Sequence, residues 1–348
     1  MVAADAQNVL VRWRRALPLT GDRCEDYTIV VPLFGDPSYF RNREQLEPYK
    51  EKVLVAAALE PEACAQLESG GWRVRSCQPE VVSPSALTHE ALADVSTEYV
   101  IRLDGDSWPA DDPGFAIGAA AAAGADLCSV KVLAARQTTA AECLQGVEYA
   151  CAMRGRHLRP WETSGACIVG RKSALQAILA RHTYWFVAED IETGVLARHL
   201  RLRIAHLDLR VWTEVPSTFR RLFGQRRAWW AGNFRITWIN FDRALHAPTS
   251  LAYAALLVWL GLVGKAATLV ATAALLPAII LLYTGITLAA NWEVRSRWMV
   301  LYPYCALVQA LVLPAFGVAR YVSLARANGT LGRLDVPRRR YVRWKYSA

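Results

Sequence analysis

Two carboxylates separated by one glycine are the first residues in this chain whose types and spacing could do chemistry. Asp104, Gly105 and Asp106 follow directly on the apolar run Tyr99–Leu103. Carboxylates this close repel each other unless a cation neutralises them, and hard oxygen ligands suit Mg²⁺ or Mn²⁺. Such a cation usually completes its coordination shell with substrate phosphates. The pattern therefore predicts a divalent-cation site, with a phosphate-bearing ligand, at the end of a buried strand.

A second acidic pair, Glu189 and Asp190, lies at the start of a helix that we predict from Val187 to Leu200. Acidic side chains at a helix start need no further function, because they favour the N-terminal end of the helix dipole. Asp190 could also act as a general base that takes a proton from a hydroxyl group in a cleft. The residues alone leave both interpretations open.

Arginine and tryptophan are concentrated in a third segment, Ser217–Asn233, which is predicted to be a helix. A basic face at a lipid surface would account for this composition. Guanidinium groups also match phosphate oxygens, and indole rings pack on sugar rings, so the segment fits a pocket for a sugar and a diphosphate. The residues concerned are Gln225, Arg226, Arg227, Trp229 and Trp230. Upstream, Trp161 precedes a Ser164-Gly165 turn.

Alternating strands and helices must position these groups. Apolar, β-branched runs predict strands at Tyr27–Phe34, Lys52–Leu59, Trp72–Ser76, Tyr99–Leu103 and Leu127–Leu133. Between them lie helix-like segments at Glu62–Glu68, Ser85–Asp94 and Ala116–Ala125. This alternation predicts an open α/β sheet with helices on both faces and a ligand beyond the carboxyl ends of the strands, where Asp36, Glu60 and Asp104 fall. The chain has neither G-x-G-x-x-G nor G-x-x-x-x-G-K-[ST], which argues against dinucleotide and P-loop sites.

Charge and apolar residues are unevenly distributed along the 348 residues. Residues 1–248 hold 29 basic and 29 acidic side chains, whereas the last 100 residues hold 11 and two and carry the net charge of +9. Met299–Ala319 has no charged residue, and Thr249–Ala290 has only Lys265. Because a membrane span needs about 20 apolar residues, we expect two or three membrane segments within 249–320, which excludes a simple soluble protein.

The compartment follows from the termini and the cysteines. The N-terminus lacks the apolar run of a signal peptide, and the basic tail after residue 320 prefers the cytoplasm, so residues 1–248 are also expected there, at the inner membrane. The tail should attract anionic lipids at about 1 kcal/mol per basic side chain, which is a better explanation than nucleic-acid binding. Eight scattered cysteines without a C-x-x-C pair indicate reduced thiols rather than disulfides or a zinc site.

The order of these motifs resembles the membrane-integrated family 2 glycosyltransferases, such as cellulose, chitin and hyaluronan synthases, over about residues 27–290. The resemblance implies a GT-A type α/β fold, a mixed sheet with flanking helices, followed by C-terminal transmembrane and interfacial helices. It also implies inverting transfer from a nucleotide-sugar, expected to be a UDP-sugar, with Mg²⁺ or Mn²⁺. The expected parts are an extension (1–26), a cytoplasmic catalytic domain (27–248), membrane helices (249–320) and a basic tail (321–348).

Matched residue by residue, the resemblance assigns the metal to Asp106 and the catalytic base to Asp190. For the nucleotide-sugar donor it implies Pro32, Glu60, Asp104, Asp106, Gln225, Arg226, Arg227 and Trp229. For the acceptor it implies Trp161, Ser164, Gly165, Glu189 and Trp230. The expected partners are the donor, a saccharide or lipid acceptor and membrane lipids, with homo-oligomer formation left open and no nucleic acid.

Two departures from the family pattern bear on the product. Ala228 stands where the QxxRW motif has an arginine, and Ala57 and Ala58 replace the usual acidic pair after the second strand, which leaves Glu60 for the nucleobase. These departures keep two functions open: polysaccharide synthesis, and the transfer of a single sugar to a lipid acceptor. A non-catalytic membrane scaffold that only keeps the fold is the third alternative.

Overall fold

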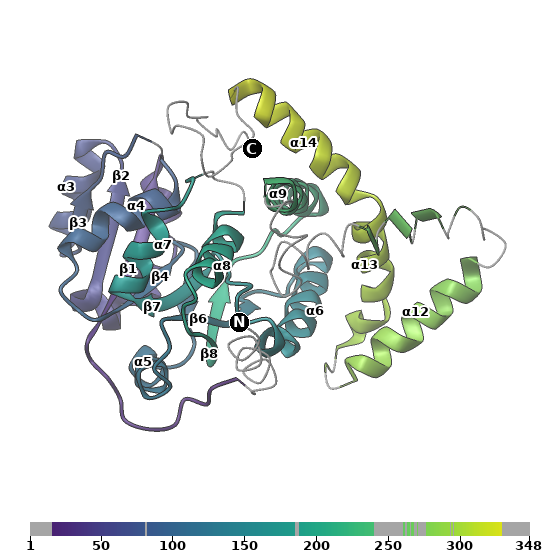
Figure 1. Cartoon of the computed structure of the whole chain (residues 1–348), viewed down its shortest axis with the longest axis horizontal. Coiled ribbons are helices and arrows are strands. Elements are labelled where there is room, and N and C mark those ends of the chain that lie inside the picture. Colours follow the sequence, from purple (N-terminus) through teal and green to yellow (C-terminus); the bar gives the residue numbers. More distant parts are fainter. Residues whose placement is uncertain are drawn as a thin grey trace. The chain divides into compact units, whose positions relative to one another are not determined.

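The computed structural model describes residues 16–80, 82–184, 188–239, 260–261, 263–264, 266–267, 270, 276–292, 294 and 296–328. The chain forms two compact units, and each is described by itself (Figure 1). The first comprises residues 1–132, 155–213 and 328–348, and the second comprises residues 133–154 and 214–327. The chain therefore enters the second unit twice.

An eight-stranded sheet with the order β3-β2-β1-β4-β7-β6-β8-β5 organises the first unit. Its strands are β1 (Tyr27–Phe34), β2 (Val53–Ala58), β3 (Arg73–Ser76), β4 (Tyr99–Leu103), β5 (Ser107–Pro109), β6 (Leu127–Ala134), β7 (Cys167–Arg171) and β8 (Ile204–Thr213). Strands β1 to β4 pair in parallel, whereas β7 runs antiparallel to both β4 and β6. The mixed α/β sheet is thus confirmed, and the sequence had indicated every strand except β5, β7 and β8.

The helices of this unit lie between the strands and pack against the sheet (Figure 1). They are α2 (Arg43–Leu46), α3 (Pro61–Ser69), α4 (Pro84–Ala91), α5 (Pro113–Ala122), α7 (Lys172–Leu179) and α8 (Glu189–His199), with 3₁₀ turns η1 (Pro37–Tyr39), η2 (Glu47–Lys52), η3 (Leu92–Asp94) and η4 (Arg156–Leu158). A proline opens both α4 and α5, where its missing N–H is no loss, and a Ser83 or Asp112 cap precedes it.

The core lies on the face of the sheet that α4, α7 and α8 cover. Val30 and Val100 in the strands are fully buried there, together with Leu87 of α4, Ile178 of α7 and Leu196 of α8. Strands covered on both faces read as continuous apolar runs, which explains the sequences of β1, β2 and β4. Each buried aliphatic side chain stabilises the fold by about 1.5–3 kcal/mol.

Strands β1 and β4 separate toward their carboxyl ends. Their register runs from the Tyr27–Tyr99 pair to the Val30–Arg102 pair, although β1 continues to Phe34 beside β2. The chain goes from β1 to β2 on one side and returns to β4 on the other, so the strand order reverses between β1 and β4. Ligands of open α/β sheets bind at such a reversal, beyond the carboxyl ends of the strands.

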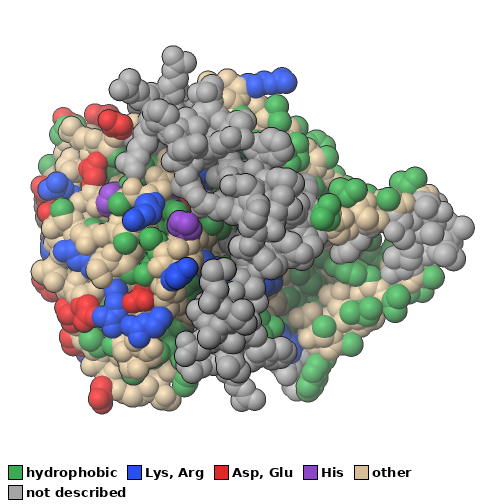
Figure 2. Space-filling model, viewed as in Figure 1, with side chains coloured by type: hydrophobic (Ala, Val, Ile, Leu, Met, Phe, Trp, Pro, Cys, Tyr) green, Lys and Arg blue, Asp and Glu red, His purple; other side chains and the backbone are tan. Residues whose placement is uncertain are grey.

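Helices make up most of the described part of the second unit, which also includes the last two residues of β6. They are α6 (Ala140–Arg154), α9 (Phe219–Ile239), α12 (Leu276–Ala290), α13 (Tyr302–Leu311) and α14 (Leu313–Asn328), with the 3₁₀ turn η6 (Arg297–Val300). Helices α9 and α14 pack closely: a Cβ atom at Gly317 would lie 2.5 Å from Cβ of Trp230, and Phe234 and Tyr321 are in edge-to-face contact at 5.4 Å. On α12, large apolar side chains such as Leu281 are about two-thirds exposed. Figure 2 shows hydrophobic side chains on the surface of this helical part.

The apolar segment 299–319, expected as one span, is broken in the structure. It is divided between η6, α13 and α14, and the pair Tyr302–Leu311 and Leu313–Ala327 bends by 41°. Within the described ranges no single helix has the length and apolarity to cross a membrane, and this bent pair meets both criteria only when its halves are taken together. In the other predicted segment, 249–290, residues 276–290 form α12, and most of residues 249–275 lie outside the described residues, as do residues 1–15 and 329–348.

Candidate active site

The loop Asp104–Asp106, called the DGD loop below, begins where β4 ends. Asp104 N–H donates to the carbonyl of Ala166 (3.1 Å), and Ser107 N–H donates to the carbonyl of Asp104 (3.0 Å). A Cβ atom at Gly105 would lie 2.6 Å from the Tyr39 carbonyl oxygen, so the loop has no room for a larger residue there. The two carboxylates are therefore carried by a tightly fixed turn.

Asn42 fixes this turn from the side of β1, a role that nothing in the sequence indicated. Asn42 is fully buried, and its backbone N–H donates to the carbonyl of Gly105 (3.0 Å). Its side-chain amide donates to the carbonyl of Asp104 (3.0 Å) and also to that of Ser107. The segment after β1 thus holds the DGD loop by its backbone carbonyls, and two of these three hydrogen bonds depend on the Asn42 side chain.

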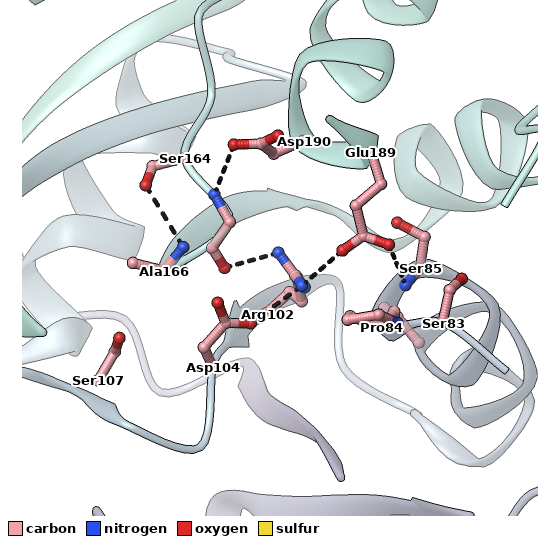
Figure 3. Close-up of polar contacts among 12 residues, drawn as sticks. Ser83, Pro84, Ser85, Arg102, Asp104, Ser107, Ser164, Ala166, Glu189 and Asp190 are labelled. Carbon is pink, nitrogen blue, oxygen red and sulfur yellow. Dashed lines mark hydrogen bonds and ion pairs between the residues drawn. The ribbon is translucent and has the colours of Figure 1, made fainter. Parts of the chain in front are cut away.

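Asp190, the predicted base, lies in the first turn of α8 and faces the turn at Gly165 (Figure 3). Its Oδ2 accepts a hydrogen bond from Gly165 N–H (3.0 Å), and its Oδ1 accepts one from the N–H of Ile191 (2.9 Å). A Cβ atom built on Gly165 would lie 3.8 Å from Asp190 Oδ2 and 3.6 Å from Asp104 Oδ2. The nearest oxygens of the two carboxylates are therefore no farther apart than the sum of these distances.

Glu189 lies beside the base but points into the protein. It is 6% exposed, and its two carboxylate oxygens accept from Arg102 (2.9 Å) and from the backbone N–H of Ser85 in the first turn of α4 (3.1 Å). Both carboxylate oxygens of Glu189 are thus used inside the fold, whereas the sequence had suggested an acceptor contact. Its carboxylate lies at the N-terminal end of α4, where the helix dipole favours a negative charge.

A cluster of carboxylates gives this site a strongly negative character. Burial raises the pKa of Asp104 to about 7; Arg102 opposes this rise, and the nearby carboxylates of Asp106, Glu189 and Asp190 add to it. Burial likewise raises the pKa of Glu189, again against the effect of Arg102. A cation near Asp104 and Asp106 would relieve this repulsion.

The residues present fit a divalent cation that is only partly coordinated by protein. Asp104 and Asp106 offer hard oxygen ligands on one short loop, whereas no group of three or more His, Cys, Asp or Glu side chains in the described residues could hold a metal ion. Mg²⁺ and Mn²⁺ sites of this kind are completed by water and substrate phosphates. The donor set therefore suits a cation that binds together with a phosphate-bearing ligand.

A cavity of about 460 Å³ lies beyond the carboxyl ends of β2 and β3. Glu60, the predicted nucleobase contact, lines it together with Pro61, Cys64, Ser76 and residues adjacent to them. Apolar walls with a few polar groups are typical of small-molecule sites. The cavity and the DGD loop thus lie at the same carboxyl-end edge of the parallel strands.

Pro32 and Trp161, two further predicted ligand contacts, are instead part of the interior. Pro32 is buried within β1, opposite Ala56 of β2. Trp161 is 8% exposed, and the guanidinium of Arg198 lies 4.4 Å from the centre of its ring. The expected donor contact of Pro32 and acceptor contact of Trp161 thus fall on side chains that are buried in this structure. By contrast, Ser164 and Gly165 lie at the site, in the turn beside Asp190.

The predicted contacts on α9 belong to the second unit, and the structure separates their roles. Arg226 is 2% exposed; it forms an ion pair with Glu148 of α6 (2.8 Å) and lies 3.9 Å from the ring centre of Trp229. The guanidinium for which the sequence had suggested a phosphate contact thus joins α6 to α9. Gln225 and Arg227 are half-buried, Trp229 is 46% exposed, and Trp230 packs against α14.

Comparison with known proteins agrees with this architecture. The family model for glycosyl transferase family group 2 matches residues 99–316, and a search of the curated proteins found no match. The mannosyltransferase PcManGT from Pyrobaculum calidifontis, solved with GDP-Man and Mn²⁺, is 14% identical with a TM-score of 0.50, covering 92% of this chain and 95% of its own. That similarity supports a GT-A-like fold.

Two other solved structures are less similar. Glucosyl-3-phosphoglycerate synthase from Mycobacterium tuberculosis is 15% identical with a TM-score of 0.39, covering 63% of this chain and 84% of its own. TarS from S. aureus is 16% identical with a TM-score of 0.39, covering 61% of this chain and 39% of its own. Because the family match covers more than half of the residues, the chain belongs to glycosyl transferase family group 2 and is a glycosyltransferase.

Proposed function

We propose that this glycosyltransferase inverts the anomeric centre and uses a divalent cation to transfer a sugar from a nucleotide-sugar donor. The observation that carries the proposal is that the carboxylates of Asp104 and Asp190 both lie beside Gly165. Their Oδ2 atoms are 3.6 and 3.8 Å from the position that a Cβ atom on Gly165 would take. A carboxylate loop for the donor diphosphate and a candidate base for the acceptor thus lie within one sugar's reach of each other. Single-displacement transfer needs this arrangement, since the acceptor and the leaving group lie on opposite sides of the anomeric carbon.

In the proposed reaction, Asp190 takes the proton from an acceptor hydroxyl as that oxygen bonds to the anomeric carbon. The bond from this carbon to the diphosphate oxygen breaks, and its electron pair leaves with the nucleoside diphosphate. The N–H groups of Gly165 and Ile191 orient the carboxylate of Asp190 for this proton transfer. A divalent cation bound at Asp106 would neutralise charge on the leaving group.

The donor is proposed to place its base in the cavity lined by Glu60 and its diphosphate at the DGD loop. The cavity volume of about 460 Å³ suits a nucleobase, and the reversal of strand order lies between the two positions. A UDP-sugar is our first expectation. GDP-mannose belongs in the same test, because PcManGT was solved with GDP-Man and Mn²⁺.

For the acceptor, we propose polysaccharide synthesis at the cytoplasmic face of the inner membrane. The exposed apolar side chains of α12, the bent apolar pair α13 and α14, and the basic tail support a membrane location. A second candidate is the transfer of one sugar to a lipid acceptor. Ala228 favours it, because the buried Arg226 cannot take the place of the arginine that the polymerase motif carries there.

The test uses the full chain in detergent or lipid nanodiscs, incubated with a panel of labelled UDP-, GDP- and other nucleotide-sugars and either Mn²⁺ or Mg²⁺. Metal-dependent release of nucleoside diphosphate from one donor supports the proposed activity, and no release from any donor refutes it. Sizing of the product then separates the candidates. A ladder or long chain supports polysaccharide synthesis, and one lipid-linked sugar supports the second candidate.

A further inference from the structure

Arg102, a buried arginine, is the one charged residue of β4, and no step of the proposed reaction uses it. Its side chain is 5% exposed. It precedes Asp104 by two residues, so both side chains lie on the same face of the strand. A buried charge is costly unless it is paired and hydrogen-bonded, and both terminal nitrogens of Arg102 have such partners.

The contacts of Arg102 join three segments that are distant in sequence (Figure 3). Its Nη1 donates to the carbonyl of Gly165 (2.6 Å), and its Nη2 donates to Asp104 Oδ1 (3.0 Å) and Glu189 Oε1 (2.9 Å). These acceptors belong to the turn before β7, the DGD loop and the start of α8. A planar guanidinium holds several acceptors at fixed angles, which a lysine ammonium cannot reproduce.

Through these contacts Arg102 also fixes the candidate base. Gly165 is held from both sides, since its carbonyl accepts from Arg102 while its N–H donates to Asp190. Glu189 precedes Asp190 in α8 and is anchored to Arg102 by one oxygen and to Ser85 by the other. Two independent connections thus run from Arg102 to Asp190, and a third runs to Asp104.

We propose that Arg102 is a positioning residue that sets the separation of Asp104 from Asp190 and weakens cation binding at the DGD loop. The first part follows from the hydrogen bonds, and it rests on the proposed function because it concerns the distance between donor and acceptor groups. The second part follows from charge: the guanidinium occupies one oxygen of Asp104 and repels any cation that approaches the other. Removal of Arg102 should therefore have opposite effects on cation affinity and on turnover.

The experiment measures Mn²⁺ affinity by electron paramagnetic resonance, with Mn²⁺ alone added to the full chain, and turnover with the donor found in the panel. For Arg102→Met, the loss of the positive charge should lower the Mn²⁺ dissociation constant about tenfold. The loss of positioning should lower kcat about 100-fold. Arg102→Lys keeps the charge but not the geometry, so Mn²⁺ affinity should be unchanged and kcat about tenfold lower.

Arg171→Met is the matched control. Arg171 lies in β7, the strand next to β4, and forms ion pairs with Glu98 and Asp126. Because these partners are outside the site, this variant should change neither Mn²⁺ affinity nor kcat. If Arg102→Met fails to fold, the double variant Arg102→Met/Glu189→Gln removes the carboxylate charge left unpaired in the interior. It is compared with Glu189→Gln alone, so that the two proteins differ only at Arg102.

Several results would overturn the inference. A folded Arg102→Met that binds Mn²⁺ no more tightly than wild type refutes the effect on the cation, as does the absence of Mn²⁺ binding in both forms. Wild-type turnover by Arg102→Lys refutes positioning. If the wild type consumes no nucleotide-sugar at all, the proposed function fails, whereas the Mn²⁺ comparison still decides the effect of Arg102 on cation binding.

Discussion

Replacement of Asp190 by asparagine changes the proposed chemistry with little change in shape. The aspartate accepts two backbone hydrogen bonds, from Gly165 at 3.0 Å and from Ile191 at 2.9 Å. An asparagine can accept one of them through its carbonyl oxygen, but its NH₂ group must face the other N–H. The variant should therefore lose about one neutral hydrogen bond, or about 1 kcal/mol of folding free energy, and remain folded.

The kinetic effect of Asp190→Asn should be much larger than the effect on stability. A positioned general base contributes about 10²–10⁴-fold, so kcat should fall by that factor, which corresponds to about 3–5 kcal/mol in activation free energy. Donor binding should stay unchanged, because the donor phosphates are assigned to the DGD loop. The assay is steady-state release of nucleoside diphosphate, together with donor affinity measured by calorimetry.

A surface carboxylate provides the control for this substitution. Asp208 of β8 forms an exposed ion pair with Lys131, so Asp208→Asn should retain full turnover and a nearly unchanged unfolding midpoint. If Asp190→Asn turns over at the wild-type rate, Asp190 is not the base. If it instead loses donor affinity in proportion to turnover, Asp190 acts in binding rather than in proton transfer.

Three further predictions concern stability. A Cβ atom at Gly194 would lie 1.8 Å from a backbone carbonyl oxygen, so Gly194→Ala should lower the unfolding free energy by about 3 kcal/mol in denaturant titrations. Gly224 has open space around it, so Gly224→Ala should raise the unfolding free energy by about 0.5–1 kcal/mol, and equal effects of the two substitutions would contradict the packing. Arg226→Ala breaks the buried ion pair with Glu148 and should lower the unfolding midpoint; an unchanged midpoint would contradict the pairing. Burial lowers the pKa of His206 to about 3, so below pH 6.5 the unfolded chain binds a proton that the folded chain does not. The unfolding free energy should therefore fall by about 2 kcal/mol from pH 6.5 to pH 5. His206→Gln should remove that loss when both proteins are titrated with denaturant.

The sequence was sufficient for the parallel strands and for the acidic loop because local patterns determine both. A continuous apolar run that ends in Gly or Asp has few alternatives to a buried strand, and the bounds of β1 match the prediction. Strands β7 and β8 were missed for the opposite reason. They pair antiparallel with partners far along the chain, and β8 mixes charged and apolar residues, so its strand character comes from tertiary contacts.

Part of the site could also not be predicted from local sequence patterns. Asn42 acts on the DGD loop through a fold that brings residues 62 positions apart together, and its identity alone indicates nothing. Arg102 did offer a sign, because a lone charge within an apolar strand, two residues before Asp104, must find partners in the interior. For Glu189 the acidic pair was recognised, but its direction into the protein depends on Arg102 and Ser85.

The apolar C-terminal region shows the same limit. Composition alone favoured one continuous helix over 299–319, but Pro303 and Pro314 lie in the first turns of α13 and α14. A proline is tolerated in the first turn of a helix and interrupts hydrogen bonding farther along. Their spacing therefore carried the information that this segment consists of two shorter helices.

The return of the chain into the second unit limits how this protein can be shortened. Helix α6 leaves the sheet after β6 and precedes β7, yet its Glu148 is the ion-pair partner of Arg226 on α9, nearly 80 positions later. A fragment that stops at residue 213 would keep α6 while losing the helix that covers Glu148. A shortened form of the protein should therefore be designed by trimming the full chain so that α6 and α9 are retained together.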